Sequence, residues 1–169
     1  LCQHCPAVNA TVNEPNAYPQ RCTYLRIAVP DAESTDLQRH FARVNDFIAT
    51  ARAAGGRTLV HCSAGMSRSV SLALAYLISA EGTCSVFSSD GCIREQNDRF
   101  NVCQFCVPPF DISLRGVGMT LVDAFRLVKT KRSIVAPNPS FMRQLAEYEA
   151  AERQRLGKPT AGPSLDLEK

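Results

Sequence analysis

The residues of this chain best suited to chemistry lie in one nonapeptide, His61 to Ser69, with the sequence His-Cys-Ser-Ala-Gly-Met-Ser-Arg-Ser. Cys62 supplies a thiol, Arg68 supplies a planar guanidinium, and five residues separate them. A phosphate group needs a nucleophile beneath its phosphorus and donors around its oxygens. A loop of this length can turn successive backbone N–H groups inward and form an anion-binding nest. The nonapeptide therefore predicts a phosphate site.

Each position of the nonapeptide has an expected role. The field of the nest and of the helix that follows favours the thiolate form of Cys62, which makes this sulfur the expected nucleophile. Arg68 offers a fork that holds two phosphoryl oxygens. We expect Ser69 to hydrogen-bond the departing thiolate and His61 to orient the loop rather than to transfer protons. The residues expected to bind phosphate are Ser63, Ala64, Gly65, Met66, Ser67 and Arg68.

The neighbouring elements favour this interpretation over the alternative, a buried cysteine before a turn with a solvated arginine. An apolar strand is expected at 58–61 and an apolar helix at 69–79, on either side of the loop. Such an order of strand, small-residue loop and helix suits a site at the carboxyl end of a strand in an α/β sheet.

Further periodic segments complete the expected fold. Apolar and polar residues alternate over 24–29, which predicts a strand. Apolar spacings of three and four, with cap and stop residues, predict helices over 36–54, 120–130 and 138–155. The predicted fold class is α/β, with a central, mostly parallel sheet flanked by helices.

The nonapeptide resembles the signature loop of the protein tyrosine phosphatase superfamily, and most closely that of the small atypical dual-specificity phosphatases. The similarity covers roughly residues 7–82 and 118–150. This resemblance implies hydrolysis of phosphotyrosine and phosphoserine/phosphothreonine in protein substrates through a phosphocysteine intermediate, with no metal and no organic cofactor. Other segments that resemble the family, in the family order, include Val8–Thr11, Tyr24–Ile27, Ala75–Leu77, Gly118–Leu121 and Gln144–Leu145.

The resemblance also implies a general acid, an aspartate in the loop after a strand upstream of the signature. Asp31 matches that position and would protonate the leaving oxygen. Asp36 is the alternative, although it lies where a helix cap is expected, and Asp31 as a plain turn residue is a third reading. Asn138 matches a family asparagine that supports the site, and a helix-cap role explains it equally well. Lys131 and Arg132 either widen the positive field or end a solvated helix.

One catalytic domain is expected over residues 1–156, followed by a flexible tail over 157–169. Only seven residues precede Val8, where the family usually has a further strand and helix, so we expect an N-terminally truncated domain. Residues 83–117 replace a short turn between two helices and are expected to be an irregular insertion that points away from the phosphate. We attribute that insertion to alternative splicing or a gene-model error.

Cysteine pairs with zinc-ligand spacing offer a competing interpretation. Two pairs, Cys2 with Cys5 and Cys103 with Cys106, each have two residues between the cysteines, as in four-cysteine zinc sites, and His4 is near the first pair. We expect no metal, because one pair lies at the start of the chain and the other in the insertion.

Composition limits the remaining functions. Hydrophobic residues make up 45% of the 169 residues, and the net charge of +3 is too small to indicate nucleic-acid binding. The sequence has no run of eighteen apolar residues, so we expect no stable insertion into a membrane. A thiolate nucleophile favours a reducing compartment, the cytoplasm or the nucleus, over a disulfide-rich secreted protein. One alternative to an active protein phosphatase is a catalytically impaired isoform that acts as a phosphate-binding module, or one whose fold is destabilised by the truncation and the insertion. Another is a phosphatase of lipid, RNA or glycan esters.

Overall fold

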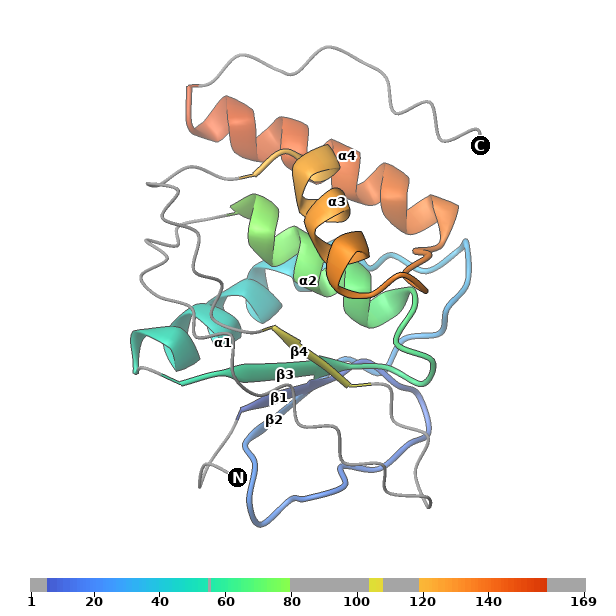
Figure 1. The fold of residues 1–169 in the computed structure, drawn as a ribbon, viewed down its shortest axis with the longest axis vertical. Helices are drawn as coiled ribbons and strands as arrows, with labels where there is room; N and C mark the ends of the chain where they lie inside the picture. The colour runs from blue at the N-terminus through green and yellow to red at the C-terminus, as the bar shows by residue number, and fades with distance from the viewer. Residues whose placement is uncertain (1–5, 55, 80–103, 108–118, 158–169) are drawn as a thin grey trace.

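One small sheet forms the base of the molecule in the computed structural model, which describes residues 6–54, 56–79, 104–107 and 119–157. Within these residues the strands are β1 (Ala7–Asn9), β2 (Tyr24–Arg26), β3 (Thr58–His61) and β4 (Gln104–Val107). Their order across the sheet is β2-β1-β3-β4 (Figure 1). β1 is parallel to β2 and β3, and β4 is antiparallel to β3. The prediction of a mostly parallel sheet is therefore confirmed.

The strand β4 corrects the expectation for residues 83–117, which the sequence analysis read as irregular. Its four residues pair with β3 over its full length, from Thr58 opposite Val107 to His61 opposite Gln104. A β-ladder joins backbone groups, so an edge strand can form without the side-chain alternation on which the prediction depended. The rest of that segment, and the predicted tail from residue 158 onward, lie outside the described residues.

The strand predicted over residues 24–29 is paired only over Tyr24–Arg26, so it is shorter than expected. Ladder pairing with β1 ends at Arg26, opposite Asn9, and one further bond joins the Ile27 N–H to the Asn9 carbonyl at 2.9 Å. The alternation nevertheless continues, because Leu25, Ile27 and Val29 are all buried. Periodicity reports which side chains face the core, whereas the ladder ends where the partner strand ends.

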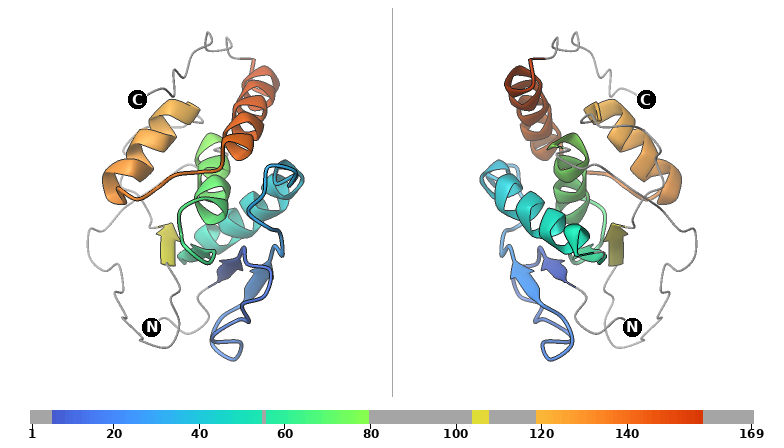
Figure 2. Two further views of the ribbon diagram at one scale, coloured as in Figure 1. Left: turned by 90° about the vertical axis from the view of Figure 1, so that its right-hand side faces the viewer. Right: turned by 90° about the vertical axis from the view of Figure 1, so that its left-hand side faces the viewer.

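The described helices lie on one face of the sheet, as Figures 1 and 2 show. A 3₁₀ turn, η1 (Gln38–His40), leads into α1 (Phe41–Ala53), so the helix predicted from residue 36 begins later than expected. The other helices are α2 (Arg68–Ser79), α3 (Leu121–Lys131) and α4 (Pro139–Arg155). Figure 2 shows α2 between the sheet and the pair formed by α3 and α4. Because α2 is covered on several sides, nearly all of its residues are buried.

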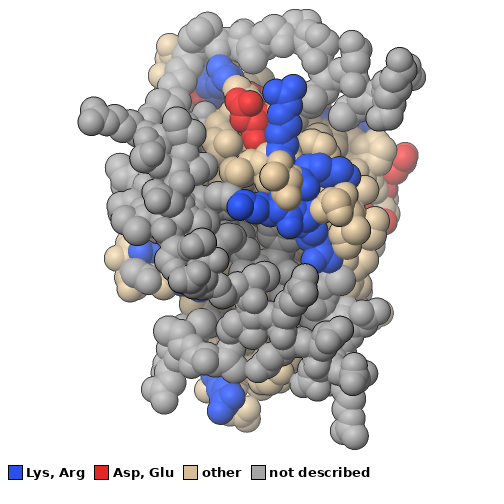
Figure 3. Space-filling view, in the orientation of Figure 1, with Lys and Arg blue, Asp and Glu red and all other residues tan. Residues whose placement is uncertain are grey.

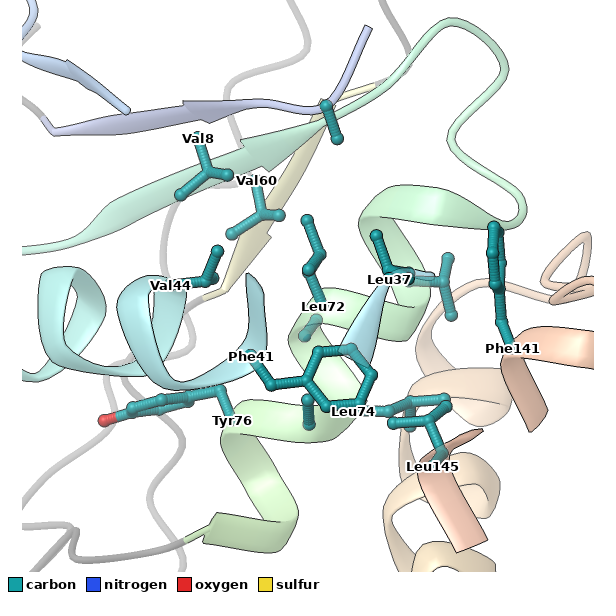
Figure 4. Close-up of a cluster of buried hydrophobic side chains, with 14 of the residues drawn as sticks. Val8, Leu37, Phe41, Val44, Val60, Leu72, Leu74, Tyr76, Phe141 and Leu145 are labelled. Carbon is teal, nitrogen blue, oxygen red and sulfur yellow. The ribbon is translucent and has the colours of Figure 1, made fainter. Parts of the chain in front are cut away.

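The hydrophobic core fills the space between the sheet and the helices (Figure 4). Val8 and Val60 project from neighbouring strands toward Leu72 of α2, and all three are fully buried. Farther from the sheet, the rings of Phe41 and Tyr148 meet edge to face, with their centres 5.1 Å apart. This packing fixes α2, and with it the loop that precedes α2.

We expect the change Leu72→Ala to lower the free energy of unfolding by about 2–5 kcal/mol, because it leaves a cavity under the sheet. The matched control is Leu156→Ala, at a position that is 41% exposed, and it should change that free energy by less than about 0.5 kcal/mol. Urea unfolding followed by circular dichroism measures both. Equal effects of the two changes would contradict the placement of Leu72 in the core.

Candidate active site

The nonapeptide forms the connection between β3 and α2, at the carboxyl end of a parallel strand. Gly65 adopts a φ of 64°, a left-handed conformation that glycine adopts without steric cost. None of the backbone amides of residues 63–67 donates a hydrogen bond to another group in the described part of the chain. Unpaired amides in a short loop before a helix are available to an anion.

Cys62 lies at the base of this loop and is 2% exposed. Its Sγ is 3.1 Å from the Oγ of Ser69, which is in the first turn of α2 and is fully buried. The structure thus places a hydroxyl beside the sulfur that the sequence analysis singled out. A hydroxyl at this distance can donate to a thiolate and stabilise its charge.

Arg68 turns its guanidinium back under the loop. Its Nη1 donates to the carbonyls of Ala10 and Val29, both at 3.1 Å, and its Nη2 donates to the Oγ of Ser63 at 3.3 Å. Ala10 and Val29 follow β1 and β2, so the side chain joins the carboxyl ends of three parallel strands. Its Nε is buried and has no hydrogen-bond partner among the described residues. That N–H is therefore available to a phosphoryl oxygen.

Asp31 lies on the Nε side of the guanidinium. One carboxylate oxygen accepts a hydrogen bond from Ser67 Oγ at 2.9 Å, and the other is 3.7 Å from Arg68 Nε. Asp36, the alternative acid, instead accepts from the backbone N–H of Arg39 at 3.2 Å, at the start of η1. Of the two aspartates, the structure brings Asp31 to the loop and leaves Asp36 in a capping role.

Asn138 caps α4 with its side chain and contacts the loop through its backbone. Its side-chain oxygen accepts from the Ser140 N–H at 2.9 Å and caps α4. Its own backbone N–H donates to Ser67 Oγ at 3.0 Å. Ser67 therefore accepts from Asn138 while it donates to Asp31, and the start of α4 is tied to the loop.

Sequence reasoning missed Glu14, which reaches the loop from the segment after β1. Ser63 Oγ donates to Glu14 Oε1 at 2.6 Å, and this bond lowers the pKa of Glu14 below its ordinary value of 4.5. The Glu14 carbonyl accepts from Arg26 Nη1 at 2.9 Å and from Asn9 Nδ2 at 3.2 Å. No local sequence pattern marks Glu14, because it reaches the loop only through the convergence of the segments after parallel strands at one edge of the sheet.

His61 ends β3 and is 6% exposed. Burial lowers the pKa of His61 below its ordinary value of 6.5, so the imidazole is neutral near pH 7. A buried neutral side chain at this position suits the expected structural role better than proton transfer with a substrate.

Basic side chains gather over α3 and the segment after it, on the face shown in Figure 3. Lys129 is tied to its own chain, because its Nζ donates to the Val135 carbonyl at 2.7 Å. The segment after α3 contacts the phosphate loop, which is the loop of residues 62–68, where the Ala136 N–H donates to the Met66 carbonyl at 3.1 Å. The positive field proposed for Lys131 and Arg132 stays a prediction.

The described ranges contain no group of three or more side chains suited to hold a metal ion. The cysteines of the alternative zinc site lie outside what the structure describes, at residues 1–5 and 103, and the Cys106 side chain is likewise undescribed. In the same described ranges, no helix is long and apolar enough to cross a bilayer.

We expect Glu14→Gln to destabilise the fold at neutral pH, because it replaces a carboxylate acceptor with a neutral one. The ionised carboxylate stabilises the fold above the unfolded-state pKa, and this contribution is lost as pH falls through the lowered folded-state pKa. The difference in unfolding free energy between unmutated chain and variant should therefore shrink from about pH 7 to about pH 3.5. Urea unfolding at both pH values measures it.

The control for this pH dependence is Glu147→Gln, at an exposed position of α4. It should change the free energy of unfolding by less than about 0.5 kcal/mol at both pH values. A Glu14→Gln difference that stays constant or grows as pH falls would show that the contact with Ser63 does not depend on the charge.

Comparisons with known proteins agree with this geometry. Residues 5–103 match the family model described as the catalytic domain of dual specificity phosphatases. The protein phosphatase Slingshot homolog of Xenopus laevis is 34% identical over 166 residues, which is 95% of this chain and 19% of that protein. Dual specificity protein phosphatase 1 of Homo sapiens is 32% identical over 143 residues, 85% of this chain and 29% of that protein. The chain therefore spans less than a third of the length of these relatives.

Solved structures show the same fold. The crystal structure of human DUSP28 aligns with a TM-score of 0.66 and 25% identity, and covers 90% of this chain and 82% of that one. A mouse putative dual specificity phosphatase aligns with a TM-score of 0.68 over 94% of this chain and 77% of that one, at 24% identity, and supports the fold alone. Together with the family match over more than half of its residues, the signature loop and its geometry place this chain in the dual specificity phosphatase catalytic-domain family.

Proposed function

We propose that this chain is a protein phosphatase that hydrolyses phosphotyrosine and phosphoserine/phosphothreonine through a phosphocysteine intermediate. The observation that carries this proposal is the arrangement around Cys62. Its sulfur is 3.1 Å from a serine hydroxyl, and neither the amides of the loop nor the Arg68 Nε has a hydrogen-bond partner in the part of the chain that the structure describes. This is a nucleophile beneath a site for three phosphoryl oxygens.

In the first step, the Cys62 thiolate attacks phosphorus. The S–P bond forms, and the bond from phosphorus to the substrate oxygen breaks with its electron pair leaving on that oxygen. The amides of the loop and the Arg68 fork hold the three equatorial oxygens, where negative charge is concentrated in transfer. The carbonyls of Ala10 and Val29 fix the guanidinium beforehand, so little reorganisation is needed when phosphate binds.

Asp31 is the proposed general acid, which gives its proton to the leaving oxygen. Its carboxylate is 3.7 Å from Arg68 Nε. A bound phosphate group would take over that contact with Arg68. The carboxyl group of Asp31 would then be free to face the leaving oxygen.

In the second step, water attacks the phosphocysteine. An O–P bond forms, the S–P bond breaks, and the thiolate leaves with its electron pair. Asp31, now a carboxylate, accepts the proton from water. Ser69 stabilises the departing thiolate through its hydroxyl, and inorganic phosphate is released with the chain regenerated.

The proposed substrates are phosphorylated proteins, and several observations support that choice. The relatives with this catalytic domain include proteins named as protein phosphatases and as dual specificity protein phosphatases. A polyanionic lipid headgroup would favour additional positive charge in the loop, and Met66 and Ser67 provide none. We place the protein in the cytoplasm or the nucleus, because both described cysteines, Cys22 and Cys62, are free thiols and the nucleophile requires reducing conditions.

We expect Cys62→Ser to abolish the hydrolysis of phenyl phosphate, because serine at this position lacks a base to ionise it. We expect Asp31→Asn to slow the reaction by roughly a hundredfold, since a phenolate is a poor leaving group without a proton donor. Release of inorganic phosphate measures both rates.

The matched control is Cys22→Ser, at the second described free cysteine, which lies outside the loop. Its rate should equal that of the unmutated chain, and circular dichroism should show all variants folded. Residual turnover in Cys62→Ser would contradict the assignment of Cys62 as the nucleophile. Loss of turnover in Cys22→Ser alone would also contradict it.

A further inference from the structure

The segment that carries Asp31 is held from the side by α4. Residues 30–37 form the last part of the connection from β2 to η1, and only Thr35 and Leu37 of these eight residues are buried. An exposed connection of this kind is usually mobile, since few apolar contacts order it. Hydrogen bonds from two α4 side chains replace those contacts.

Gln144 makes the larger set of these bonds. Its Oε1 accepts from the backbone N–H groups of Leu37 at 2.8 Å and Gln38 at 2.9 Å. Its Nε2 donates to the carbonyl of Thr35 at 2.8 Å. The first turn of η1 has amides without partners inside the turn, and Leu37, at its N-cap, makes no side-chain cap. Gln144 therefore caps η1 from another helix.

Ser140, one turn earlier on α4, continues this contact toward Asp31. Its Oγ donates to the Glu33 carbonyl at 2.8 Å. Within the segment, Thr35 Oγ1 donates to the Pro30 carbonyl at 3.0 Å. The backbone on both sides of Asp31 is thus connected to α4 through Ser140, and through Thr35 to Gln144.

The same helix also fixes the phosphate loop. The Asn138 N–H, at its start, donates to Ser67 Oγ, and Ser67 donates to Asp31. One rigid element therefore sets the position of the segment with the acid and of the loop with the nucleophile. The distance between the segment with Asp31 and the loop with Cys62 therefore depends on α4 rather than on a movement of the segment toward a bound substrate.

We propose that Gln144 is a positioning residue for the acid, which holds residues 30–38 so that Asp31 stays over the phosphate loop before substrate binds. This inference rests on the proposed role of Asp31. Gln144 suits the task because its amide has an acceptor for two N–H groups and a donor for a carbonyl, whereas alanine leaves all three unpaired.

The test uses two aryl phosphates whose leaving groups differ in basicity, p-nitrophenyl phosphate and phenyl phosphate. Loss of a general acid slows the ester with the more basic leaving group much more. We expect Gln144→Ala to lower kcat/KM for phenyl phosphate by roughly tenfold and to leave p-nitrophenyl phosphate within roughly twofold. A purely structural defect would slow both esters by the same factor, which would overturn the proposal.

A double variant shows whether Gln144 acts through Asp31. In Asp31→Asn the acid is already absent, so adding Gln144→Ala should cause little further loss on phenyl phosphate. A multiplicative loss would show that Gln144 acts independently of Asp31 and would overturn the proposal. The variant Gln144→Glu keeps an acceptor for the two N–H groups, so it should recover part of the rate lost in Gln144→Ala. It replaces Gln144→Ala in the test if the alanine variant does not fold.

The matched control is Gln154→Ala, the same change at an exposed position of the same helix. It should leave both rates unchanged. Hydrogen exchange of the Leu37 and Gln38 amides provides a readout that does not need activity, and only Gln144→Ala should accelerate it. Unchanged exchange in Gln144→Ala would overturn the proposed contact by itself. If Gln144→Ala accelerates exchange but the unmutated chain has no turnover, the contact is retained. In that case the proposed function is overturned, and with it the role of Gln144 toward Asp31.

Discussion

A guanidinium that is largely excluded from solvent must have its charge and most of its N–H groups matched by the protein, because leaving them unmatched costs several kcal/mol. Arg68 is 9% exposed, and the matching groups come from the segments that follow three different strands of the sheet. It bonds the carbonyls after β1 and β2 and the hydroxyl of Ser63 after β3. The backbone ladders bring the carboxyl ends of the parallel strands together, and this one buried cation then links the segments that follow them to the loop around Cys62.

This constraint explains why two carboxylates lie at a site built for an anion. Asp31 is near the Nε side of Arg68, and Glu14 lies on the other side, linked through Ser63 Oγ. These two carboxylates balance the buried charge of Arg68. They differ in how they are held: Glu14 is fixed by bonds to its own carbonyl, whereas Asp31 depends on Ser67 and on the contacts of its segment with α4. In the proposed mechanism, Asp31 is the carboxylate that exchanges its arginine contact for proton transfer.

The sequence predicted those parts of the site that are local in the chain. Nine consecutive residues, His61 to Ser69, contain the loop, and apolar patterns on either side predicted β3 and α2. Glu14 and the capping role of Gln144 were not predicted, because each bonds a partner that is brought near only by the tertiary fold. The strand Gln104–Val107 was missed for a related reason, since its pairing with β3 uses backbone groups and leaves no mark in the side-chain pattern.

The measurement that tests this account most directly is identification of the residue that carries phosphate during turnover. The chain is mixed with an aryl phosphate, the reaction is stopped within milliseconds, and the peptides are mapped by mass spectrometry. We expect the phosphoryl group on the sulfur of Cys62, with its amount rising before steady state and then constant. A phosphoryl group on His61 or Ser69, or turnover without any phosphorylated peptide, would contradict the assignment of Cys62 as the nucleophile.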